Sequence, residues 1–139
     1  MKVGVIGLGW MGRVHLRVYS QMRGVDIVGV TDVSQEALEQ VKEQYGVPVF
    51  PDLDEMLDQK PDAVSVCVPT VHHHEVGLNV IGRGIPLLME KPLAATVAEA
   101  EELVVRATDK NVPLMVGHLE RFNPAVARIK ELVEGKDVI

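Results

Sequence analysis

The stretch KVGVIGLGWMG, residues 2–12, decides the fold because it joins a buried strand to a glycine-rich turn. Its first half is a β-branched run with no charge after the first residue, which is typical of a strand covered on both faces. Gly7, Gly9 and Gly12 follow with G-x-G-x-x-G spacing, where the strand ends and a helical pattern begins. The stretch therefore predicts a strand, a tight turn and a closely packed helix.

Each glycine of this turn has a physical role in binding a dinucleotide. Gly7 permits the tight turn, Gly9 lets backbone N–H groups approach a pyrophosphate, and Gly12 lets the helix pack closely on the strand. The anion then lies at a helix N-terminus, where unsatisfied N–H groups and the helix dipole favour negative charge. A glycine-rich turn without a ligand is the alternative interpretation. We expect the whole turn to contact the cofactor: Gly7, Leu8, Gly9, Trp10, Met11 and Gly12.

The rest of the chain alternates short apolar runs with helical patterns, which is typical of a parallel sheet with helices on both faces. We predict that a final helix begins at Asn123-Pro124, because proline is favoured at the first helical position. Its helical pattern ends near Gly135. We therefore predict a doubly wound parallel α/β sheet, the Rossmann fold. The further apolar runs are residues 26–31, 47–50, 63–68, 86–89 and 114–117.

Composition excludes several classes of protein. The 139 residues are 47% hydrophobic and 24% charged, which is an ordinary globular balance. The net charge of −6 disfavours binding to nucleic acid, and no apolar run approaches the ~20 residues needed to cross a bilayer. Cys67, the single cysteine, has no disulfide partner and is expected as an inert thiol inside a buried strand. We therefore expect a soluble cytoplasmic protein with no nucleic-acid or membrane partner.

Asp32 stands twenty residues after Gly12, at the end of the second predicted strand. A carboxylate at this place accepts hydrogen bonds from the adenosine ribose hydroxyls and repels a 2′-phosphate. Val33 and the two residues after it carry no positive charge that could bind a phosphate. We therefore predict NAD rather than NADP as the cofactor, with Asp32 and Val33 in its site. A simple helix cap is the alternative interpretation of Asp32.

Glu90-Lys91-Pro92 follows the fifth predicted strand, at the end where ligands bind in open parallel sheets. A lysine at that place can hydrogen-bond a substrate hydroxyl and help to take its proton. Lys91 is therefore the candidate catalytic residue, and it is also expected beside the cofactor together with Glu90. The alternative interpretation is a solvated ion pair in a loop.

The segment from Pro69 to His74 follows the fourth predicted strand and contains three adjacent histidines. Adjacent residues do not face one another on a helix, and no H-E-x-x-H or C-x-x-C spacing supports a metal site. We therefore predict no metal and expect one histidine to line the cofactor crevice. Five methionines on apolar faces are expected in the core: Met11, Met22, Met56, Met89 and Met115.

In combination these motifs resemble the N-terminal domain of the Gfo/Idh/MocA family, the group of glucose-fructose oxidoreductase and inositol dehydrogenase. The resemblance rests on the glycine turn, on Asp32, on the P-T-x-x-H stretch from Pro69 to His73 and on EKP at residues 90–92, and it extends into residues 117–124. It implies an NAD(P)-dependent oxidoreductase that oxidises a secondary hydroxyl of a sugar, nucleotide sugar or cyclitol by hydride transfer.

The resemblance also implies roles for particular residues. The family's EKP lysine lies beside the nicotinamide and assists proton transfer, which corresponds to Lys91. The preceding glutamate corresponds to Glu90, near the nicotinamide ribose. His73 corresponds to the histidine of the P-N/T-x-x-H motif, while Thr70 replaces a frequent asparagine. Val68 and Pro69, at the start of that motif, complete the expected cofactor site.

Members of the family carry a second, mainly β-sheet domain that binds substrate, and its pattern is absent from this sequence. We therefore interpret residues 1–122 as a dinucleotide-binding Rossmann domain and residues 123–139 as a helix that leads towards a missing C-terminal substrate domain. A homo-oligomer is expected. The alternative function is a stand-alone, non-catalytic NAD-binding module. A methyltransferase is disfavoured because EKP would then have no role.

Overall fold

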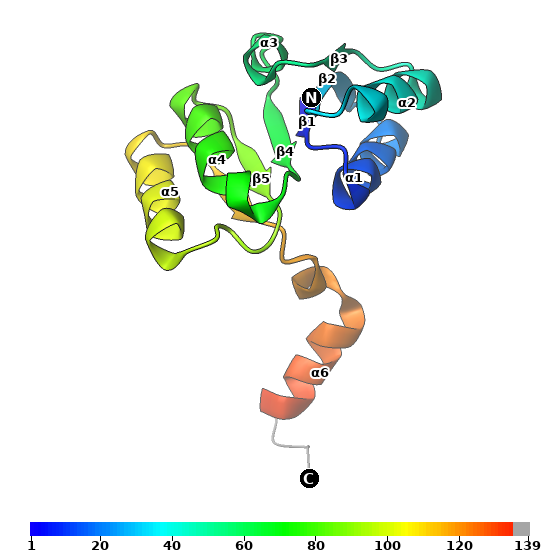
Figure 1. Cartoon of the computed structure of the whole chain (residues 1–139). Helices are drawn as coiled ribbons and strands as arrows, with labels where there is room; N and C mark the ends of the chain where they lie inside the picture. Colours follow the sequence, from blue (N-terminus) through cyan, green and yellow to red (C-terminus); the bar gives the residue numbers. More distant parts are fainter. Residues whose placement is uncertain (135–139) are drawn as a thin grey trace.

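Strand β1 (Lys2–Ile6) lies inside the sheet because its side chains are apolar on both faces. The neighbours Val5 and Ile6 are 0% and 3% exposed and belong to two separate core clusters, as alternation along a strand requires. The computed structural model, which describes residues 1–134, is accordingly a sheet with one hydrophobic core on each face (Figure 1).

The sheet contains six parallel strands in the order β3-β2-β1-β4-β5-β6. Because the chain crosses from β3 to β4, the strand order reverses between β1 and β4. Ligands of open α/β sheets bind at such a point, beyond the carboxyl ends of the strands. This topology confirms the predicted doubly wound Rossmann fold. The other strands are β2 (Asp26–Thr31), β3 (Val49–Phe50), β4 (Ala63–Val66), β5 (Leu87–Met89) and β6 (Leu114–Val116).

Helices α1 (Trp10–Gln21) and α2 (Gln35–Tyr45) pack on one face of the sheet. The other face is covered by α3 (Leu53–Leu57), α4 (His73–Gly82) and α5 (Val97–Asp109) (Figure 1). Side chains at the helix starts satisfy first-turn N–H groups, since Ser34 accepts from Ala37 and Thr96 forms a capping box with Glu99. None of the helices within residues 1–134 combines the length and the apolar character needed to cross a membrane.

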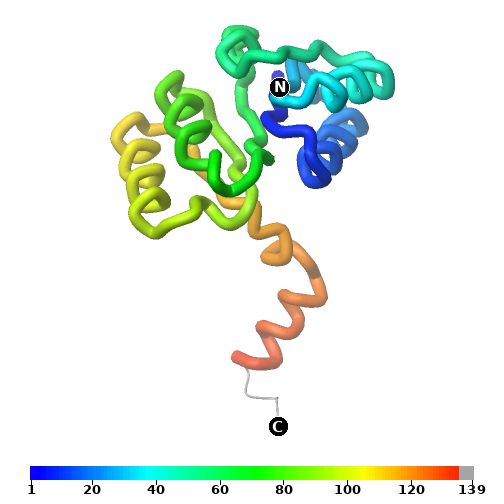
Figure 2. Tube along the Cα trace, viewed as in Figure 1, coloured from blue at the N-terminus to red at the C-terminus, as the bar shows by residue number. Residues whose placement is uncertain are grey.

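Two short 3₁₀ turns, η1 (Thr70–His72) and η2 (Leu119–Phe122), follow β4 and β6. The final helix, α6 (Pro124–Glu134), has no buried residue. It projects away from the sheet and its covering helices (Figures 1 and 2). The predicted helix end near Gly135 lies outside the described residues.

The expectation that all five methionines are in the core is wrong for three of them, of which Met11 is only partly buried and lines the cleft described below. Met56 and Met89 are 0% exposed, but Met22 and Met115 are 47% and 49% exposed. Met22 follows the last residue of α1, so it no longer faces the sheet. Leu114 packs against the core on the face covered by α3, α4 and α5, so Met115, the next residue of the strand, points to the opposite face. Because β6 is the edge strand, α1 and α2 do not cover Met115 on that face.

Candidate functional site

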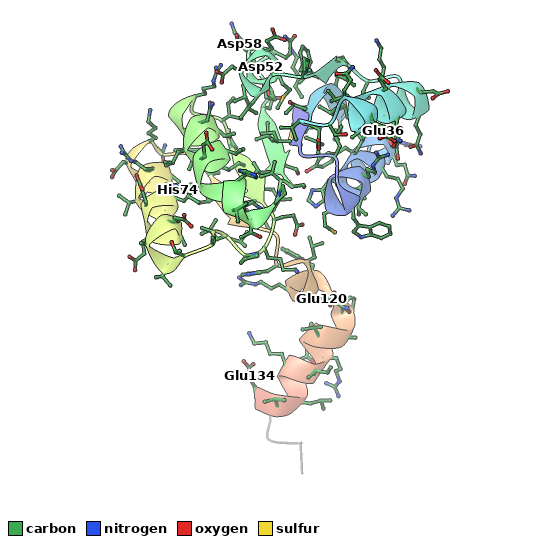
Figure 3. All side chains as sticks on the ribbon, in the orientation of Figure 1. Glu36, Asp52, Asp58, His74, Glu120 and Glu134 are labelled. Atoms are coloured by element: carbon green, nitrogen blue, oxygen red, sulfur yellow. The ribbon has the colours of Figure 1, made fainter. Side chains whose placement is uncertain are left out.

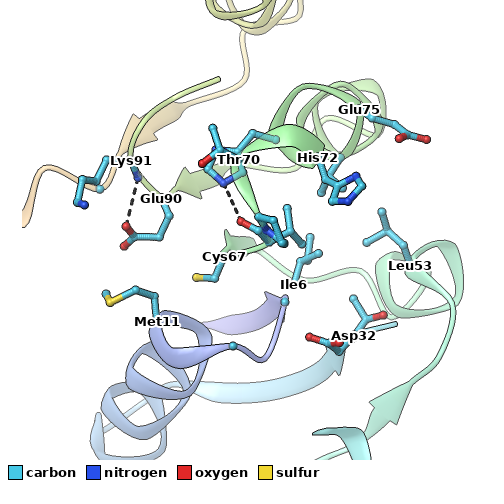
Figure 4. A pocket seen from close by; sticks show the side chains of 18 of the residues that line it. Ile6, Met11, Asp32, Leu53, Cys67, Thr70, His72, Glu75, Glu90 and Lys91 are labelled. Carbon is cyan, nitrogen blue, oxygen red and sulfur yellow. Dashed lines mark hydrogen bonds between the residues drawn. The ribbon is translucent and has the colours of Figure 1, made fainter. Parts of the chain in front are cut away.

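A cleft of about 1060 Å³ opens at the carboxyl ends of the strands, around the point where the strand order reverses (Figure 4). It brings together four segments that are far apart in the sequence: the glycine turn after β1, the acidic end of β2, the segment after β4 and the segment after β5. The predicted site residues that line it are Gly7, Gly9, Met11, Asp32, Val33, Val68, Pro69, Thr70, His73, Glu90 and Lys91.

Three residues of the glycine turn do not line this cleft. Leu8 is 2% exposed and packs in the core between α1, α2 and the sheet. Gly12 is buried in the first turn of α1. Trp10 is 83% exposed at the start of the same helix. Of the three side chains in the turn, Leu8 therefore packs in the core, Met11 lines the cleft and Trp10 is exposed to solvent.

The glycines of the turn are required for different reasons. Gly7 has a φ of +89°, and a Cβ there would lie 2.7 Å from the Cys67 carbonyl carbon. A Cβ on Gly12 would lie 1.8 Å from the carbonyl oxygen of Gly7, so α1 packs directly against the turn. A Cβ on Gly9 would meet no atom within 4 Å. Gly7 and Gly12 therefore build the turn, whereas Gly9 leaves space open in the cleft.

The N-terminus of α1 supplies donors for an anion in that space. Gly9 is the N-cap residue and provides no side-chain hydrogen bond to the first turn. The first N–H groups of a helix have no intrahelical partner, and they carry the positive end of the helix dipole. Arg13 stabilises the turn through a hydrogen bond, in which its Nε donates to the carbonyl oxygen of Leu8 at 3.0 Å. Open space above free N–H groups fits the diphosphate of a dinucleotide.

Asp32 follows β2 and holds its carboxylate against the glycine turn. Oδ2 accepts the N–H of Leu8 at 2.6 Å, and Oδ1 accepts the N–H of Ser34 at 2.8 Å. Ser34, not Asp32, caps α2, so the helix-cap interpretation of Asp32 does not hold. Each carboxylate oxygen retains a further lone pair, and Asp32 lines the cleft. Its carboxylate can therefore still accept hydrogen bonds from ribose hydroxyls.

Glu90 and Lys91 follow β5 and have different environments. Glu90 is 7% exposed, and its Oε1 lies 3.2 Å from Nε2 of His15. Lys91 is exposed and lines the cleft, while its backbone N–H donates to Oε2 of Glu90 at 3.2 Å (Figure 4). The two residues do not form the solvated ion pair that was the alternative interpretation. Glu90 points inward, whereas Lys91 lines the cleft.

The three adjacent histidines point in different directions. His73 is 1% exposed, and its ring nitrogens lie 2.8 Å from the carbonyl oxygen of Pro92 and 2.9 Å from that of Val68. His74, which Figure 3 labels on α4, contacts Glu102 of α5 at 2.9 Å, and His72 faces the cleft (Figure 4). Within residues 1–134, no group of three or more His, Cys, Asp or Glu side chains is placed to hold a metal ion. His73 instead ties the segment after β4 to the segment after β5.

Cys67 lies one residue beyond β4 and lines the cleft, so its expected place inside a buried strand is wrong. The strand ends at Val66 because the chain turns there towards η1. Burial, together with the negative charge of Glu90, raises the pKa of the Cys67 thiol from 9.0 to about 12. The thiol is therefore neutral at ordinary pH and a poor nucleophile, as expected from the sequence.

Sequence reasoning missed several cleft residues. Pro51 and Leu53 line the cleft beside Asp32, and His118 and Arg121 of the η2 region line it beside Lys91. Their position directly after β3 and β6 was the available signal, because all parallel strands end at the same edge. His15 was also missed, although it follows Gly12 at the helical spacing that places both on the buried face of α1.

The fold and the cleft together define a dinucleotide-binding Rossmann domain. The family model described as "Oxidoreductase family, NAD-binding Rossmann fold", GFO_IDH_MocA, matches residues 1–118. The chain belongs to this family. The match confirms the family resemblance stated from the sequence and the predicted cofactor, NAD.

Relatives with established names show the same relationship. The chain is 32% identical to UDP-N-acetylglucosamine 3-dehydrogenase of Acidithiobacillus ferrooxidans over 94% of its length and 41% of the relative's. It is 30% identical to myo-inositol 2-dehydrogenase of Thermotoga maritima over 96% and 41% of the two chains. The sequence therefore spans about 41% of the length of these relatives.

Solved structures agree with this assignment. The A. ferrooxidans enzyme superposes with a TM-score of 0.87 over 94% of this chain and 42% of its own. Scyllo-inositol dehydrogenase of Lactobacillus casei, solved with NAD(H) and scyllo-inositol, is 25% identical and gives a TM-score of 0.90 over 99% and 42% of the two chains.

Proposed function

We propose that this chain is the nucleotide-binding part of an NAD-dependent oxidoreductase that oxidises a secondary hydroxyl of a sugar, nucleotide sugar or cyclitol. One observation carries the proposal: Lys91 shares a single cleft with Asp32 and the open space above Gly9. A dinucleotide that extends from Asp32 across the glycine turn would lead towards Lys91. The substrate class follows the names of the relatives, which act on a nucleotide sugar and on cyclitols.

In this proposal different residues of the chain bind different parts of the cofactor. The first-turn N–H groups of α1 hold the diphosphate, and Asp32 accepts hydrogen bonds from the adenosine ribose. Val33 lies beside that ribose, while Val68, Pro69 and Thr70 form the wall opposite the glycine turn. Bound NAD supplies the acceptor for a hydride.

Lys91 acts on the substrate. As the neutral amine, its Nζ accepts a hydrogen bond from the hydroxyl that is oxidised and takes the proton from that oxygen, becoming an ammonium. Glu90 is 7% exposed and its carboxylate faces His15 and the Lys91 N–H, so Lys91 rather than Glu90 meets this hydroxyl. A lysine so placed makes deprotonation of the hydroxyl easier as the carbinol hydrogen departs.

The substrate would be held by a second domain. We assign residues 1–122 to the dinucleotide-binding domain and residues 123–139, which include helix α6 (Pro124–Glu134), to the segment that leads into a C-terminal substrate domain. The shared length of about 41% with the named relatives supports this division. The isolated chain would then lack dehydrogenase activity, because correct positioning and exclusion of water both need the substrate domain. A homo-oligomer and a cytoplasmic location, consistent with a single unpaired cysteine, complete the proposal.

The test is turnover by the full-length protein, followed as NADH formation with myo-inositol, glucose 6-phosphate and UDP-N-acetylglucosamine. We expect NAD-dependent oxidation of at least one of them. Lys91→Ala should lower turnover by roughly 10²–10⁴-fold, the usual contribution of a positioned acid or base. NAD affinity should change far less, since Lys91 acts on the substrate.

Lys42→Ala is the matched control, because Lys42 is exposed in the last turn of α2 and does not line the cleft. Full activity in the Lys91→Ala protein would remove the assigned role of Lys91. NAD binding without oxidation of any of the alcohols would contradict the enzyme proposal and favour a stand-alone NAD-binding module.

A further inference from the structure

A chain of buried polar groups connects α1 to the end of β5. Tyr19 Oη lies 2.6 Å from Oγ of Ser65, and Ser65 Oγ lies 2.9 Å from Nδ1 of His15. Nε2 of His15 lies 3.2 Å from Oε1 of Glu90. Ser65, His15 and Glu90 are 0%, 7% and 7% exposed. Polar groups this deeply buried are costly unless each is paired, so the four side chains depend on one another.

One set of hydrogen-bond directions, with the His15 ring neutral, satisfies all four groups. The Glu90 carboxylate only accepts, so Nε2–H of His15 donates to it. Nδ1 of a neutral ring then accepts from the Ser65 hydroxyl, and Ser65 Oγ accepts from the Tyr19 hydroxyl. Every donor finds an acceptor in this arrangement. The imidazole is thereby held as the tautomer that carries its proton on Nε2.

Glu90 is held in turn by three parts of the fold. Oε1 faces His15 of α1, and Oε2 accepts the backbone N–H of Lys91. A Cβ on Gly117 would lie 3.0 Å from Oε1, so the segment after β6 packs against the same carboxylate. The Glu90 side chain is therefore the point where α1, the Lys91 turn and the end of β6 meet.

We propose that His15 is a positioning residue, which acts through Glu90 to fix the Lys91 turn relative to the glycine turn. His15 and the first-turn N–H groups belong to the same helix, α1. The network therefore makes the anion site and Lys91 parts of one rigid unit. The importance of this unit for turnover rests on the function proposed above for Lys91. The positioning itself is measurable without substrate.

Two substitutions separate positioning from packing. The side-chain amide nitrogen of His15→Gln can occupy the place of Nε2 and donate to Glu90. The shorter His15→Asn reaches only the place of Nδ1, so it keeps the Ser65 contact and loses Glu90. The measurement is hydrogen exchange of the Lys91 amide by NMR of the 139-residue chain, with the Val66 amide of β4 as an internal control.

We expect His15→Asn to speed exchange at Lys91 by about tenfold, which corresponds to the loss of roughly one hydrogen bond. His15→Gln should keep the wild-type rate, and Val66 should be unaffected in both. Equal exchange at Lys91 in wild type and His15→Asn would overturn the proposal. So would faster exchange at Lys91 and Val66 alike, because His15 would then only support the core.

A second measurement needs no variant. Nitrogen-15 NMR of the His15 ring in the wild-type chain should show a proton on Nε2, and a ring without it would overturn the proposal. In the full-length protein, His15→Asn should lower turnover while NADH affinity stays constant. If His15→Asn speeds hydrogen exchange at the Lys91 amide but leaves turnover unchanged, the proposed role of Lys91 in turnover is wrong, while the positioning of the Lys91 turn by His15 is supported.

Discussion

The carboxylate of Asp32 accepts the backbone N–H of Leu8, with 2.6 Å between Oδ2 and the nitrogen. This hydrogen bond joins the end of β2 to the glycine turn after β1. Asp32 therefore holds the turn and also presents its charge to the cleft. We propose that this one side chain serves both the shape of the turn and the selection of the cofactor.

Cofactor preference should change when that charge is replaced. Asp32→Ser combined with Val33→Arg removes the repulsion of a 2′-phosphate and adds a partner for it. We expect the affinity for NADPH relative to NADH to rise by about 10- to 100-fold, because a hydrogen bond to a charged group contributes roughly 1.5–3 kcal/mol. Calorimetric titration with both nucleotides measures the ratio.

Asp32→Asn is the control for this prediction, since the amide oxygen can still accept the N–H of Leu8. It should weaken discrimination without creating a phosphate contact. An unchanged affinity ratio in the Asp32→Ser, Val33→Arg protein would show that Asp32 does not read the ribose.

The glycines of the turn should respond differently to a single methyl group. Gly12→Ala should destabilise the chain by about 1–3 kcal/mol or more, because the Cβ would lie 1.8 Å from the Gly7 carbonyl oxygen. Gly9→Ala should cost about 1 kcal/mol or less, since its Cβ meets no atom within 4 Å. That methyl would enter the cleft and weaken NADH binding. Urea unfolding and NADH titration of both variants test the contrast, and equal stability losses would contradict it.

The positions of Asp32 and Lys91 could be predicted because parallel strands end at one edge, so sequence motifs at strand ends converge in the cleft. The phase of α1 could not be predicted in the same way. In the sequence, Met11, Val18 and Met22 are apolar residues at helical spacing, yet Val18 is 45% exposed and His15 is buried. Hydrophobic spacing alone therefore indicates the wrong buried face for α1. His15 can be buried only because it hydrogen-bonds Ser65 and Glu90, and these partners are distant in the sequence and meet only in the folded chain.

Cys67 should make stability depend on alkaline pH. Its pKa is raised from 9.0 to about 12 by burial and by the charge of Glu90, so the folded state favours the neutral thiol. The resulting stability is fully present below pH 9.0 and is lost as the pH rises towards about 12. In that window the free energy of unfolding should fall by up to about 1.4 kcal/mol per pH unit more than in Cys67→Ala. Parallel pH curves for the two proteins would exclude this effect.

The apolar stripe of α6 should drive association of the isolated chain. Val126, Ile129 and Val133 are 39%, 59% and 59% exposed at helical spacing, on a helix that projects from the fold (Figure 1). Exposed apolar surface of this kind favours burial against another copy when no second domain covers it. We expect sedimentation velocity to show oligomers that increase with concentration.

Ile129→Ser with Val133→Ser should weaken that association by at least about tenfold, because burying each side chain contributes up to roughly 1.5–3 kcal/mol. The matched control is Val104→Ser with Val105→Ser, which removes two valines that are 49% and 55% exposed on α5 instead. The control should associate as the unmodified chain does, because it leaves the α6 stripe intact. A strict monomer at high concentration, or equal weakening by both pairs of substitutions, would show that α6 is not the associating surface.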